Sequence, residues 1–173
     1  MVFSAGIAAL GLMNDSAAVV IGAMLVAPLM TPIMAFASAV IQTWSKRAFE
    51  SFAIVATGAF LGIAVGWLTS LIIPRIGPDT PLPEQVLART SPNLADLGIA
   101  LLAGAAGAYV TVRTEAGSAL PGVGIAVALV PPLATVGITL GAGRGELALG
   151  ALLLFITNFA AITLAAGLMF AFA

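Results

Sequence analysis

The chain has 173 residues, of which 61% are hydrophobic and 8% are charged, and its net charge is −1. A soluble domain carries roughly 25% charged residues, so this composition excludes an ordinary soluble fold and predicts an all-α polytopic membrane protein. The small negative charge argues against a nucleic-acid partner. Cysteine and histidine are absent, which removes most zinc sites and the commonest general base. We therefore expect no metal, no cofactor and no enzymatic activity.

Apolar segments follow one another along the chain, separated by short polar turns. They predict about six transmembrane helices, at residues 1–13, 16–42, 48–73, 94–112, 119–141 and 146–172. The first is shorter than the ~20 residues that a span needs, so two interpretations fit it: a span whose beginning is missing, or a helix lying in the interface.

A polar, proline-rich linker at residues 74–92 divides the chain into a first three-helix unit, 1–73, and a second, 93–173. Within this linker, residues 83–89 predict a short interfacial helix that begins with proline. At 173 residues the membrane core is small for a transporter, so we expect a homo-oligomer.

The third segment carries Gly58, Gly62 and Gly66. Residues four positions apart share one helix face, and small residues on a face let another helix approach closely. We interpret this face as a packing surface, within one protomer or between protomers.

One unusual motif occurs twice, once in each half. Residues 19–33 read VVIGAMLVAPLMTPI, residues 123–137 read VGIAVALVPPLATVG, and seven of the fifteen positions are identical. Both copies place proline inside a long apolar stretch, where a continuous helix loses a hydrogen bond and meets a steric clash. The second and fifth helices are therefore predicted to be broken. Because three spans separate the two copies, the halves should form two inverted three-helix repeats.

Backbone carbonyls released at such breaks cannot face lipid, and must face protein, water or a ligand. A kinked packing helix is the alternative interpretation of the prolines, and an interhelical hydrogen bond is the alternative for the mid-span Asn158. No carboxylate, lysine or arginine is expected deep inside a span, which disfavours a proton-coupled pump. The candidate substrate-binding, ion-binding or gate residues are Pro28, Thr31, Pro32, Pro131, Pro132, Thr135 and Asn158.

Three long stretches of the chain resemble one known family. They read NDSAAVVIGAMLVAPLMTPI, RTSPNLADLGIALLAGAAGAY and ALPGVGIAVALVPPLATVGI, and they resemble a bacterial and archaeal family of hydrophobic integral membrane proteins catalogued as a domain of unknown function. The resemblance runs from about Gly11 to Ala166. It implies a multi-span membrane domain, often preceded by a small soluble domain, and it supplies no established substrate or catalytic residue.

From these patterns we expect a multi-pass protein of the cell (inner) membrane that transports or conducts a small solute or ion through a site formed by the two broken helices. Its expected partners are the lipid bilayer, further copies of itself and that solute. The alternative is a non-transporting anchor or sensor module that oligomerises and supports a soluble domain. Duplicated broken helices favour transport.

Overall fold

The computed structural model describes residues 1–74, 76–113 and 120–172, and every regular element within these ranges is a helix. In chain order the helices are α1 (Val2–Met13), α2 (Ala17–Leu25), α3 (Met30–Ile41), α4 (Ser45–Ile72), α5 (Glu84–Leu87), α6 (Leu94–Arg113), α7 (Leu120–Gly141) and α8 (Gly145–Ala171). The all-helical prediction is confirmed.

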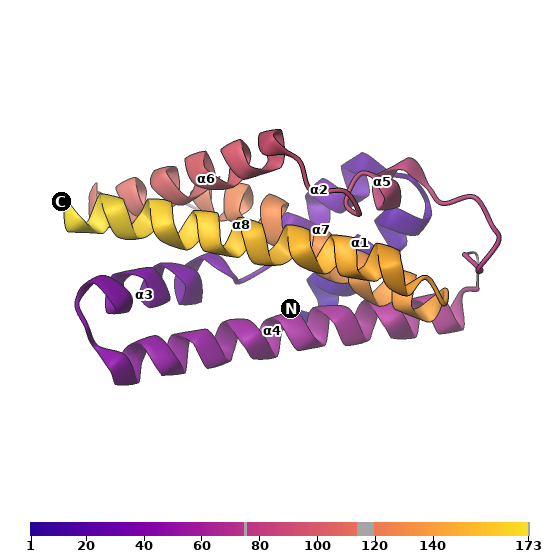
Figure 1. The fold of residues 1–173 in the computed structure, drawn as a ribbon, viewed down its shortest axis with the longest axis horizontal. Helices are drawn as coiled ribbons and strands as arrows, with labels where there is room; N and C mark the ends of the chain where they lie inside the picture. The colour runs from indigo at the N-terminus through magenta and orange to yellow at the C-terminus, as the bar shows by residue number, and fades with distance from the viewer. Residues whose placement is uncertain (75, 114–119, 173) are drawn as a thin grey trace.

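Two long helices, α4 and α8, run in opposite directions along the longest axis of the molecule (Figure 1). They contain 28 and 27 residues, which at 1.5 Å per residue gives about 40 Å, more than the ~30 Å hydrocarbon core of a bilayer. Helix α7 packs against both of them.

The described helices give a smaller count of spans than the sequence predicts. Three of them, α4, α6 and α8, are long and apolar enough to cross a membrane, and the bent pair of α2 and α3 makes a fourth. By the same measure, α1 and residues 128–141 of α7 are shorter apolar helices. Helix lengths in the described part of the chain therefore support several spans and fall short of six.

Many large apolar side chains lie on the outside of the bundle, and many alanines lie on the inside. Phe3, Phe60 and Leu102 are exposed, whereas alanines such as Ala100 and Ala134 are fully buried. Lipid solvates large apolar side chains as well as a protein core does, and small residues allow close helix packing. This distribution indicates a membrane protein.

The glycine stripe of α4 lies in the interior. Gly58, Gly62 and Gly66 are all buried. A Cβ atom at Gly62 would meet the Leu133 side chain at 3.3 Å, and one at Gly66 would lie 2.5 Å from the backbone oxygen of Ala134. The stripe therefore contacts α7 at two positions, within a single chain.

The two proline motifs fold differently. The second segment is broken between α2 and α3, which meet at a bend of 61°, so the predicted break is confirmed there. The fifth segment is one helix, α7, that runs through Pro131 and Pro132. The prediction of a broken fifth helix is wrong, because α7 satisfies a freed carbonyl by a tertiary hydrogen bond, as described below.

The turns that precede α4 and α8 have the same backbone geometry. Thr43 and Gly143 both have positive φ, at 56° and 75°. The N–H of the next residue in each turn, Trp44 or Arg144, donates to the carbonyl five positions earlier, at 2.9 and 2.8 Å. This bond belongs to the Schellman motif that ends many helices, so α3 and α7 end in the same way.

The linker is tied to both halves of the bundle. Arg144 Nη2 donates to the carbonyl oxygens of Gly77, at 3.0 Å, and Thr80. The backbone N–H of Gln85, in α5, donates to Asp15 Oδ1 at 2.8 Å. The predicted short helix is present as α5, and the linker returns from the end of α4 toward the middle of α8 (Figure 1).

We expect Arg144→Ala to loosen the linker while the bundle stays folded. The substitution removes charge-assisted hydrogen bonds worth ~1.5–3 kcal/mol when well formed, and these bonds tie the turn at Gly77 and Thr80 to the start of α8. Hydrogen exchange of residues 76–82 in detergent should rise, whereas exchange in α4 and α8 should not change. Lys46→Ala, which removes an exposed cation on α4, is the matched control. Unchanged exchange in the linker would contradict this role.

Candidate functional site

The prolines of α7 leave a carbonyl without its usual helical donor, and a side chain replaces that donor. Pro132 has no N–H to give to the carbonyl four residues earlier, that of Ala128. Asn158, on α8, donates its Nδ2 hydrogen to this carbonyl oxygen at 2.9 Å. The amide is 3% exposed, so the bond is shielded from competition by water. Asn158 thus makes the interhelical bond that the alternative interpretation expected.

The first proline motif satisfies the equivalent carbonyl locally. Pro28 withholds its N–H from Met24, and the Met24 oxygen accepts the N–H of Ala27 at 3.2 Å. This bond closes a tight turn of four residues, 24–27, which ends α2 and lets the chain change direction. The same proline chemistry thus gives a break in one half and a continuous helix in the other.

A second polar group comes from the first turn of α6. The Asn93 side chain accepts the N–H groups of Ala95 and Asp96, at 2.8 and 3.0 Å, and Asp96 Oδ2 accepts the N–H of Asn93 at 3.1 Å. This reciprocal pattern is a capping box, which satisfies donors at the start of a helix. It leaves Asp96 Oδ1 without a partner among the hydrogen bonds of the described residues.

The linker contributes a cation. Arg89 follows α5, and its Nη1 donates to the backbone oxygen and to the side-chain Oε1 of Gln85, at 2.6 and 3.2 Å. Burial lowers the pKa of the Arg89 guanidinium, and the negative charge of Asp96 opposes this effect. A partly buried cation of this kind is stabilised further by any additional negative charge that approaches it.

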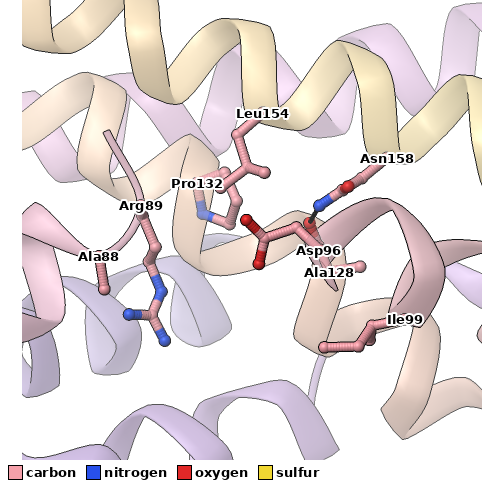
Figure 2. A pocket seen from close by; sticks show the side chains of 8 residues that line it. All are labelled: Ala88, Arg89, Asp96, Ile99, Ala128, Pro132, Leu154 and Asn158. Carbon is pink, nitrogen blue, oxygen red and sulfur yellow. Dashed lines mark hydrogen bonds between the residues drawn. The ribbon is translucent and has the colours of Figure 1, made fainter. Parts of the chain in front are cut away.

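These groups line one cavity of about 190 Å³, at the meeting point of the linker, α6, α7 and α8. In the view of Figure 2, Arg89 and Asn158 lie at opposite ends and Asp96 lies between them. The side-chain oxygen of Asn158 is buried and has no hydrogen-bond partner. The lining residues are Ala88, Arg89, Asp96, Ile99, Ala128, Pro132, Leu154 and Asn158.

Only part of the predicted site is brought together here. Pro132 and Asn158 line the cavity. Thr135 is fully buried and its hydroxyl has no hydrogen-bond partner. Pro28 and Thr31 are exposed on the single chain, and neither lines this cavity. The remaining predicted residues are Pro32, half-buried in the first turn of α3, and Pro131, buried in α7.

Sequence reasoning overlooked the two charged residues of the cavity. Asp96 belongs to the first turn of α6 and lines the cavity. No charged residue was expected deep inside a span, and Asp96 was therefore not included in the predicted site. The pattern Asn93-x-x-Asp96 directly after Pro92 was a detectable signal, because it marks a capped helix start. Nothing in the local sequence places that start beside the middle of α8, and the role of Arg89 depends on the same tertiary arrangement.

The comparison with known proteins matches the resemblance seen in the sequence. The model of a family described as a domain of unknown function (DUF389) matches residues 24–164. The chain belongs to this family. The matched region contains the prolines of both motifs and every residue that lines the cavity.

One curated relative is a longer archaeal protein. The uncharacterized protein MJ0678 of Methanocaldococcus jannaschii is 34% identical over 170 residues, which cover 98% of this chain and 52% of that protein. The chain thus spans about half the length of this relative. No solved structure matches the chain.

Proposed function

We propose that this protein transports or conducts a small polar solute or ion across the membrane, and that the cavity between the linker, α6, α7 and α8 lies on the route. The observation that carries the proposal is the buried, unpaired oxygen of Asn158 in a cavity that also contains Asp96. An unsatisfied buried acceptor costs ~1–3 kcal/mol. A ligand that donates a hydrogen bond there would recover this energy.

The position of the cavity along the bundle supports a transport role. Leu154 and Asn158 lie in the middle of α8, and the capped start of α6 lies beside them rather than at the end of the bundle (Figure 1). In many transporters, helices that begin at mid-depth direct their partial positive ends toward anionic groups of bound solutes. In α6 the carboxylate of Asp96, in the first turn, offsets that positive end. The linker, with Arg89, would then enter the bundle from the side where α4 ends.

We retain the two inverted three-helix repeats as part of this proposal. Helix α3 leads into α4 and α7 leads into α8, and these pairs run in opposite directions along the long axis (Figure 1). The matching Schellman turns at Thr43 and Gly143 support this relation between the two halves.

A flux measurement tests the proposed function. The chain is reconstituted in liposomes, and the entry of a panel of ions and small polar solutes is compared between the intact protein and Asp96→Asn. Asparagine keeps an oxygen that can accept the Asn93 N–H, so α6 should remain capped while the charge is lost. We expect the flux of the transported solute to fall at least about tenfold, which corresponds to ~1.4 kcal/mol.

Glu146→Gln is the matched control, because Glu146 is an exposed carboxylate in the first turn of α8 and does not line the cavity. Its flux should equal that of the intact protein. If the intact protein moves none of the solutes, the transport proposal fails. If Asp96→Asn keeps full flux, the cavity is not on the route. The expected homo-oligomer stays a prediction, which the mass of the protein in detergent micelles tests.

A further inference from the structure

We infer that the solute held in this cavity is a small zwitterion, with an ammonium group and a carboxylate group a few bonds apart. This inference deepens the proposed function and rests on it for the solute's access to the cavity. It is argued from the charges of Arg89 and Asp96, the unpaired oxygen of Asn158 and the size of the cavity.

The acceptors of the cavity lie together. Asp96 keeps Oδ1 free of partners among the hydrogen bonds of the described residues, since its Oδ2 accepts the Asn93 N–H. Asn158 Nδ2 donates one hydrogen bond to the Ala128 carbonyl, and its side-chain oxygen is buried without a partner, so this oxygen is the acceptor that Asn158 can offer a ligand. An ammonium group has three donors and no acceptor. It is therefore the group that suits one carboxylate oxygen and one amide oxygen.

The donors of the cavity come from the other end. Arg89 uses Nη1 for Gln85, and among the described bonds its Nε and Nη2 atoms have no partner. Guanidinium groups bind carboxylates with two parallel hydrogen bonds. A carboxylate bound here would stabilise the partly buried positive charge of Arg89.

The opposite charges of Arg89 and Asp96 together disfavour solutes that carry only one charge. A simple cation attracted by Asp96 would be repelled by Arg89, and a simple anion attracted by Arg89 would be repelled by Asp96. A zwitterion pairs both. The cavity of about 190 Å³ has room for a small solute of this kind.

Binding in detergent tests the inference separately from transport. Purified protein is titrated by calorimetry with glycine, β-alanine and 4-aminobutyrate, which differ in the separation of their charges. Methylammonium, acetate and acetamide each carry one polar group only: an ammonium, a carboxylate and a neutral amide. We expect one of the zwitterions to bind at least about tenfold more tightly than every single-group compound, and Asp96→Asn and Arg89→Gln each to weaken that binding about tenfold or more. Glu146→Gln and Lys46→Gln should leave it unchanged.

The outcomes separate the two proposals. Equal or tighter binding of a single-group compound, or no binding of any zwitterion by the intact protein, overturns the inference. Flux of an inorganic ion or of a neutral solute in liposomes would in that case still uphold the proposed function. Selective binding of a zwitterion without any flux would uphold the inference and overturn the transport proposal. The comparison of zwitterions with single-group compounds uses the intact protein, so it tests the inference even if a variant fails to fold.

Discussion

Gly137→Ala should strongly destabilise the bundle, although alanine is the better helix former. A Cβ atom at Gly137 would lie 2.2 Å from the backbone oxygen of Ile63 and 2.5 Å from the backbone nitrogen of Trp67. Neither backbone atom can move unless α4 shifts as a whole. Overpacking of this kind costs ~1–3 kcal/mol and sometimes more, which exceeds the ~1 kcal/mol that alanine gains over glycine inside a helix.

Thermal unfolding in detergent measures this effect. Each kcal/mol corresponds to roughly 2–4 °C in Tm for a domain of this size, so Gly137→Ala should lower the Tm by several degrees. The matched control is Gly22→Ala in α2, where a Cβ atom would meet nothing within 4 Å. That control should leave the Tm unchanged or raise it slightly. A Gly137→Ala protein as stable as the control would show that α4 and α7 do not cross at this point.

Asn158→Leu should destabilise the protein mainly when Pro132 is present. Leucine resembles asparagine in size but gives no donor, so the Ala128 carbonyl would be buried without a partner. A lost buried hydrogen bond of this kind costs ~1–3 kcal/mol. Pro132→Ala restores a backbone N–H that can reach the same carbonyl. In the Pro132→Ala background, therefore, the loss of Asn158 should cost less.

A double-mutant cycle on the free energy of unfolding tests this coupling. Residues that share one hydrogen-bond network show coupling energies of ~0.5–3 kcal/mol, and we expect about 1 kcal/mol here. Thr157→Val supplies the control, since the Thr157 hydroxyl bonds within its own helix, to the Leu153 oxygen at 2.9 Å. This control should show no coupling to Pro132. Strictly additive effects of Asn158→Leu and Pro132→Ala would mean that the amide does not replace the missing donor.

The cavity contains a carboxylate, a guanidinium and an amide, whereas the sequence predicted a site made mainly of broken helices. Pro132 and Asn158 were expected there and line it, whereas Asp96 and Arg89 were not expected. The prolines were recognisable because a missing N–H is a property of the residue itself. The charged pair was missed because its proximity depends on how α6 and the linker pack against α8.

The sequence by itself determined the class of the protein and the places where helices are stressed. Composition excludes a soluble fold, the apolar segments specify helices, and proline removes a backbone donor wherever it occurs. These properties are local and do not depend on distant contacts. The prediction of the break between α2 and α3 follows from them.

Only the tertiary structure decided whether an apolar segment with internal prolines breaks or continues as one helix. In the first half the Met24 carbonyl turns to a neighbouring N–H and the helix ends, whereas in the second half the amide of Asn158 arrives from α8 and α7 continues. The physical reason is that a freed carbonyl needs one donor, and a distant side chain can supply it as well as the local backbone can. Whether a helix continues through its proline therefore depends on the donor that a neighbouring helix provides.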